Sequence, residues 1–94
     1  MKETVRFKDY LDKELKNSEF RKVFDEEEIY ASLAIQIAKL RQRKHLTQKQ
    51  LARQLHTTQQ TVSRLEDIHN KRYSLRTLIK LAHALDKQLQ VRLV

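Results

Sequence analysis

Four polar side chains with the hydrogen-bonding chemistry needed to read DNA bases lie in one short stretch of the chain. They are Gln59, Gln60, Ser63 and Arg64. In the major groove, glutamine can bond to adenine at two points, and arginine can do the same with guanine. Val62 and Leu65 recur between them at helical spacing, so one helix would bury the apolar pair and expose the polar residues. The alternative is that the glutamines are inert surface residues, but their place at the front of the predicted helix favours base contact.

A second short helix is predicted just before this one. Thr47 and Gln50 have the spacing of a capping box, and Leu51 and Leu55 follow on one helical face. Two short helices joined by a tight turn make a helix-turn-helix, which places its second helix in the major groove of DNA.

Other side chains near these helices could hold the phosphate backbone. The candidates are Thr47, Gln48, Thr58, Lys71 and Arg72. Lys71 and Arg72 could equally belong to an ordinary polar loop. Their position just after the base-reading helix favours phosphate contact.

Charge is distributed unevenly along the chain. Residues 1–28 contain seven Lys and Arg and nine Asp and Glu, whereas residues 29–94 contain thirteen and three. A small domain with a net charge of +10 in its second part attracts polyanions, and this attraction weakens as salt rises. The pattern favours nucleic acid as the partner of residues 29–94. RNA is disfavoured, because the reading surface lies on a helix without aromatic stacking residues.

Two longer helices are predicted to support the helix-turn-helix. One begins with Asp25 as its cap and runs to about Lys44, with Arg41 on its apolar stripe, and the other begins at Ser74. Without any Gly or Pro, helix ends need other residues that tolerate left-handed backbone. The residues placed to do this are His45, His56, Asn70 and Asp86.

The N-terminal segment has a large apolar content for its length. A helix is predicted for residues 4–16, followed by a shorter helical piece. Their apolar side chains are Phe7, Tyr10, Leu11, Leu15, Phe20, Val23 and Phe24. An apolar patch on a slightly acidic segment favours a binding surface for a basic partner. The alternative is that these side chains fold back onto the core.

The C-terminal residues alternate between apolar and polar. Leu89, Val91 and Leu93 would share one face of a strand, with Gln90 and Arg92 on the other. A single strand has unpaired edges, so we expect it to pair with its copy in a two-fold dimer.

Several function classes are disfavoured by composition. The chain has no Cys, its four His lack metal-ligand spacing, and no serine or carboxylate has a catalytic context, so we expect no metal, no cofactor and no enzymatic activity. No apolar run suggests a membrane span or a signal peptide. We therefore expect a cytoplasmic, nucleoid-associated bacterial protein.

Residues 33–86 resemble the helix-turn-helix repressors of lambdoid phages and the wider xenobiotic-response-element class of regulators. The likeness is strongest over Thr57 to Glu66. It implies base reading by Gln59, Gln60 and Arg64 and phosphate contact by Gln48. It also implies an ion pair between Arg41 and Glu66.

A second resemblance covers nearly the whole chain and is to HigA-type antitoxins. It rests on Phe7 to Arg21, Leu46 to Ala52, Ser74 to Ala82 and Leu89 to Val94. The resemblance implies a dimer that represses its own operon and neutralises a RelE/HigB-type mRNA-cleaving toxin. The alternative is a stand-alone repressor without a toxin partner.

Together these observations predict an all-α protein, a lambda-repressor-like helix-turn-helix bundle with an N-terminal helical extension and a short C-terminal β-strand. Residues 1–28 would be the extension and bind the toxin, residues 29–86 would bind operator DNA, and residues 87–94 would form the dimer.

Overall fold

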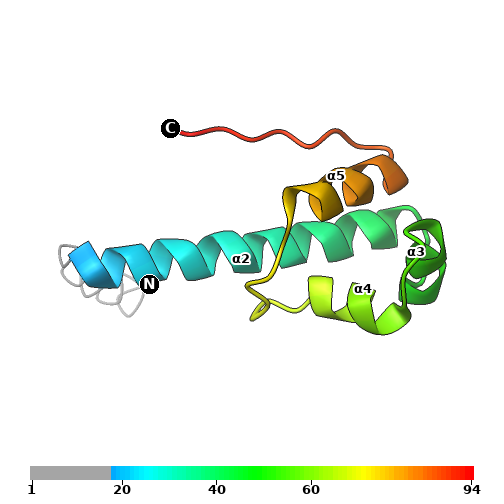
Figure 1. Ribbon diagram of the computed structural model, residues 1–94, viewed down its shortest axis with the longest axis horizontal. Helices are drawn as coiled ribbons and strands as arrows, with labels where there is room; N and C mark the ends of the chain where they lie inside the picture. The colour runs from blue at the N-terminus through cyan, green and yellow to red at the C-terminus, as the bar shows by residue number, and fades with distance from the viewer. Residues whose placement is uncertain (1–17) are drawn as a thin grey trace, which may run out of the picture.

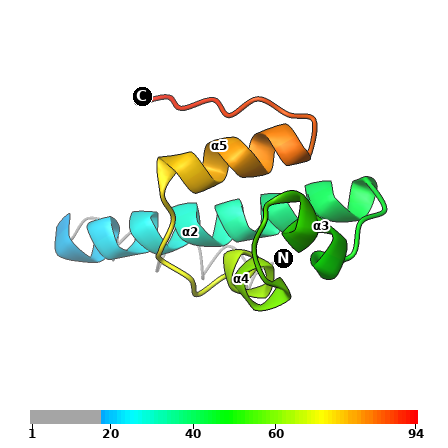
Figure 2. The ribbon, with the colours of Figure 1, turned by 45° about the vertical axis from the view of Figure 1, so that its right-hand side comes forward.

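The computed structural model describes residues 18–94, which form four α-helices (Figure 1). In chain order these are α2 (Ser18–Arg43), α3 (Gln48–Gln54), α4 (Gln59–Leu65) and α5 (Leu75–Ala84). In both views α5 and the C-terminal segment lie on one side of α2 and α4 lies on the other (Figures 1 and 2). The helix predicted for residues 4–16, with Phe7, Tyr10, Leu11 and Leu15, falls outside the described residues.

The long helix α2 corrects one expectation. A new helix was predicted to begin at Asp25, but α2 runs without a break through 26 residues from Ser18 to Arg43. An N-cap residue leaves helical geometry, and no left-handed residue ends a helix within residues 18–24 as His45 does before Thr47. The expected boundary between residues 28 and 29 therefore lies inside a single helix.

Hydroxyl side chains begin the three shorter helices. Thr47, Thr58 and Ser74 each accept a hydrogen bond from the backbone N–H three residues later, at 3.0 to 3.2 Å. At α3 the bond is reciprocated, because Gln50 Oε1 accepts from the Thr47 N–H at 2.8 Å. This is the predicted capping box, and it sets the start of the helix-turn-helix.

Left-handed residues end α2, α3 and α5. His45, His56 and Asp86 have φ between 56° and 58°. In each case the next residue donates back to a carbonyl five positions earlier, as Thr57 does to Ala52 O at 2.9 Å. These three predicted helix ends are confirmed.

The prediction for Asn70 was wrong, because Asn70 is not among the residues with positive φ. Its side chain shapes the loop instead. Asn70 Oδ1 accepts from the Arg72 N–H at 3.1 Å, and Nδ2 donates to the Arg72 carbonyl at 3.3 Å. An asparagine side chain can bend the chain in this way without left-handed backbone.

One apolar core joins all four helices. Its buried side chains are Ala34, Ile37, Leu51, Ala52, Val62, Leu65, Leu81 and Leu85. Only Val62 and Leu65 come from α4. The short helix α4 is therefore attached by two side chains, and the rest of its surface is left for other contacts.

An exposed ion pair joins the ends of α2 and α5. Lys44 Nζ donates to Asp86 Oδ2 at 2.6 Å and to the Ala84 carbonyl at 3.2 Å. The hydrogen bond from Lys44 holds the pKa of Asp86 below its usual value. Because the Asp86 side chain is 79% exposed, the pair orients the helix ends more than it stabilises them.

The C-terminal segment corrects a second expectation. Residues 87–94 run as an extended coil along α5, and no β-strand is formed within residues 18–94 (Figure 2). A strand requires a neighbour that completes its hydrogen bonds, and nothing in this part of the chain offers one. Val91 and Leu93 remain 67% and 99% exposed.

None of the four described helices combines the length and apolar character that a membrane span requires.

Candidate nucleic-acid interface

The four predicted base-reading side chains share the solvent side of α4. Gln59, Gln60, Ser63 and Arg64 are all exposed, while Val62 and Leu65 are buried beneath them. The two apolar residues point into the core, so the polar residues between them must point outward. Since α4 lies across α2 from α5 and the C-terminal segment, neither of those elements covers it (Figures 1 and 2).

Two of the predicted phosphate contacts are helix caps. The Thr47 hydroxyl accepts from the Gln50 N–H at 3.0 Å, and the Thr58 hydroxyl accepts from the Thr61 N–H at 3.2 Å. Both threonines are exposed. A hydroxyl group can accept one bond from the helix and still donate to a phosphate oxygen. For Thr58 this requires that the Thr61 hydroxyl be the donor in the 3.0 Å bond between the two side chains.

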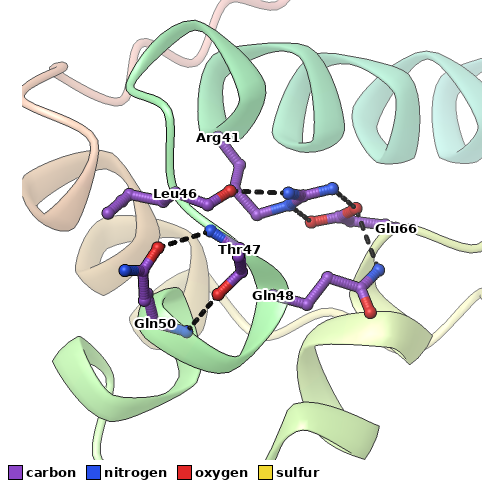
Figure 3. A network of polar contacts seen from close by, with 6 residues as sticks. All are labelled: Arg41, Leu46, Thr47, Gln48, Gln50 and Glu66. Carbon is purple, nitrogen blue, oxygen red and sulfur yellow. Dashed lines mark hydrogen bonds and ion pairs between the residues drawn. The ribbon is translucent and has the colours of Figure 1, made fainter.

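A partly buried polar network ties α4 to α2 and α3 (Figure 3). Arg41 Nε and Nη2 donate to the two carboxylate oxygens of Glu66 at 2.6 and 3.0 Å. Arg41 Nη1 also donates to the Leu46 carbonyl at 2.7 Å. The side chains of Arg41 and Glu66 are only 13% and 7% exposed. The expected ion pair is thus present, in the bidentate geometry that gives such pairs directional strength.

Gln48 belongs to the same network, and the sequence did not predict this contact. Its Nε2 donates to Glu66 Oε1 at 3.2 Å (Figure 3). Gln48 is the first residue of α3 and Glu66 is the C-terminal cap of α4, so this bond joins the two helices of the motif. One amide hydrogen and the amide oxygen are left, so the bond restricts where Gln48 points without excluding a phosphate contact. Residues 18 positions apart give no sequence signal for such a bond.

A tyrosine pair also holds the C-terminal end of α4, and the sequence did not predict this contact either. The Tyr73 hydroxyl donates to the Leu65 carbonyl at 2.7 Å, and its ring stacks on Tyr30 of α2 with centroids 6.1 Å apart. Burial raises the pKa of Tyr73, which keeps its hydroxyl protonated as a donor. The end of α4 is therefore anchored to α2 through two routes.

The loop between α4 and α5 presents the two predicted basic residues. Lys71 and Arg72 are both exposed. Lys71 Nζ forms an ion pair with Glu27 of α2, and this hydrogen bond raises the pKa of Lys71. The Arg72 backbone is held by Asn70 on both its N–H and its carbonyl.

Among the described residues, those predicted to bind protein partners lie elsewhere. Phe20 and Phe24 of α2 stack with centroids 6.3 Å apart, and Val23 is 58% exposed. Leu89 is half-buried beside α2 and α5, while Val91 and Leu93 are exposed on the C-terminal segment. The structure does not bring either group together with the polar surface of α4.

Comparison with known proteins agrees with this geometry. A family model described as a helix-turn-helix domain matches residues 20–94. The match covers most of the chain, so the protein belongs to this helix-turn-helix family and is a DNA-binding regulator similar to the xenobiotic-response-element class. The family is typically non-enzymatic. No curated protein and no solved structure gives a significant match.

The Arg41–Glu66 pair predicts a large effect on stability. Glu66→Ala leaves a nearly buried guanidinium without its counter-charge, which should lower the free energy of unfolding by about 3–5 kcal/mol. Lys44→Ala, which removes the exposed pair with Asp86, should cost far less, because solvent already screens that pair. Urea unfolding followed by circular dichroism measures both. Similar losses for the two variants would show that the buried pair has no special importance.

Proposed function

We propose that this protein is a transcriptional repressor that reads its operator with α4. The observation that supports this most directly is the outward row of Gln59, Gln60, Ser63 and Arg64 above a buried apolar pair. Glutamine and arginine have the donors and acceptors that match adenine and guanine in the major groove. The anchors at Glu66 and Tyr73 hold the helix that would present them.

Phosphate binding is proposed for the residues around α4. Lys71 and Arg72 follow it, Thr58 begins it, and Thr47 and Gln48 begin α3. Contacts of this kind fix the orientation of the protein on DNA but carry no sequence information. They would therefore set general affinity, whereas the α4 side chains would set the preferred sequence.

We propose a homodimer formed through residues 87–94. The segment is extended, its backbone lies without a strand partner within residues 18–94, and Leu93 is almost fully exposed. Pairing with its copy would satisfy one edge and cover these apolar side chains. Because the segment lies across α2 from α4, such a dimer would leave both recognition helices free, with half-sites about 34 Å apart.

We further propose that the protein neutralises a small basic toxin of the RelE/HigB type and represses its own operon. The first half of α2 extends beyond α3, α4 and α5 (Figure 1). It exposes Val23 at 58% and Ile29 at 65%, next to an acidic run at residues 25–28. Apolar side chains flanked by carboxylates suit a basic protein partner. A stand-alone repressor, in which this segment has no toxin to bind, is the alternative.

Base reading predicts a loss of specificity from changes on α4. Gln59→Ala, Gln60→Ala and the charge-conserving Arg64→Lys should each weaken binding to the selected operator by about 1–3 kcal/mol while sparing random duplex. Lys71→Ala should instead weaken both alike. Gel-shift titrations on a duplex selected from a random pool measure this, with Gln36→Ala on α2 as the matched control. If the α4 variants weakened both duplexes alike and Lys71→Ala weakened only operator binding, the proposed base-reading and phosphate-binding roles would be reversed.

Dimerisation predicts a response to charge at the C-terminal segment. Leu93→Asp should convert the dimer to a folded monomer, because the side chain is exposed in the single chain and would be covered in the pair. Gln90→Asp, on the opposite face of the predicted strand, serves as the control. Sedimentation equilibrium gives the mass of each. A parent protein that is monomeric at micromolar concentrations would rule out this interface.

The proposed toxin site predicts that toxin binding can be lost without loss of DNA binding. Val23→Asp in the full chain should prevent co-purification with the small basic protein encoded by a neighbouring reading frame, yet leave operator binding intact. Leu75→Asp introduces the same charge at an exposed apolar position on α5 and should not prevent it. Capture by Val23→Asp at full strength would place the toxin site elsewhere. If the parent captures no such protein, the stand-alone repressor is favoured.

A further inference from the structure

We infer that Glu27 competes with DNA phosphate for the ammonium group of Lys71 and thereby lowers the affinity of the protein for duplex DNA. This inference rests on the proposed role of Lys71 in phosphate binding. The two side chains form an ion pair between α2 and the loop that follows α4. Glu27 is thus an acidic residue held at a position where, on binding, a phosphate oxygen would be required.

The loop that carries Lys71 begins at the end of the recognition helix. In both views the loop leaves the end of α4 and then crosses α2 to reach α5 (Figures 1 and 2). The loop is internally braced, because Tyr73 bonds to Leu65, Asn70 holds Arg72, and Asp67 Oδ1 accepts from the His69 N–H at 2.9 Å. These bonds hold the loop backbone to the end of α4. The long side chain of Lys71 can still move its ammonium group from one partner to another.

The ion pair is placed so that it can be exchanged. The side chains of Lys71 and Glu27 are 51% and 43% exposed, so solvent reaches both charges. Solvated pairs of this kind contribute little to stability, and they separate at small cost when another partner is present. A lysine ammonium is a point charge on a flexible stem and can turn from a carboxylate to a phosphate without a change in the backbone.

Glu27 differs in this respect from its acidic neighbours. Asp25, Glu26 and Glu28 lie on the same stretch of α2, but the ion pair with Lys71 is made by Glu27 alone among these four. Removing any of these charges would reduce the general repulsion of DNA. Removing Glu27 would in addition free Lys71. The gain in DNA affinity beyond that of a neighbouring substitution therefore measures the competition.

The experiment compares Glu27→Gln with Glu28→Gln, which removes the same charge one residue away. At low salt Glu27→Gln should bind a random duplex about two- to fivefold more tightly than Glu28→Gln, the factor expected from releasing one exposed ion pair. The advantage should shrink as salt is raised. In a Lys71→Ala background the two substitutions should have equal effects. Circular dichroism on each variant checks that the helices are retained.

Two results would overturn the inference while leaving DNA binding itself intact. One is equal affinity of Glu27→Gln and Glu28→Gln. The other is an advantage of Glu27→Gln that survives Lys71→Ala, which would show that Lys71 is not the group released. A parent protein with no measurable affinity for duplex DNA would instead overturn the proposed function, and this inference with it.

Discussion

The ion pair between Arg41 and Glu66 is the interaction on which the position of α4 depends. Two charges taken almost out of water destabilise a fold unless each is neutralised and hydrogen bonded. Here Glu66 receives three hydrogen bonds, two from Arg41 and one from Gln48, and Arg41 gives its third to the Leu46 carbonyl. These bonds can all form only when α2, α3 and α4 have one relative arrangement. The network therefore specifies where α4 lies.

This constraint matters because α4 has little stability of its own. A helix of seven residues is too short to persist in water, and only Val62 and Leu65 attach it to the core. The remaining anchors are polar and lie at its end, where Glu66 bonds to Arg41 and the Leu65 carbonyl accepts from Tyr73. A helix held at its end and along one buried edge can expose its other side chains in a fixed orientation, as base reading requires.

Helix starts and most helix ends were predictable because they depend on neighbouring residues. Thr47 and Ser74 cap the helices that follow them, and His45, His56 and Asp86 take the left-handed backbone expected of them. Predictions were wrong where a local sequence signal was overridden by the surrounding structure. Asp25 resembles a cap but lies inside α2, and the alternating pattern of residues 87–94 yields no strand within the described chain. A cap signal is overridden when the helix can continue, and a strand cannot form without a second edge.

The sequence alone determined the helix-turn-helix, its apolar core and the outward polar residues of α4. Helical periodicity and capping depend on residues only a few positions apart, so the sequence shows them directly. The partner of Arg41 came from a family resemblance. Only the tertiary structure decided that Gln48 bonds to Glu66, that Tyr73 joins Tyr30 and Leu65, and that Lys71 meets Glu27. These contacts join residues far apart in the chain, and their distances follow from how the helices pack rather than from any local pattern.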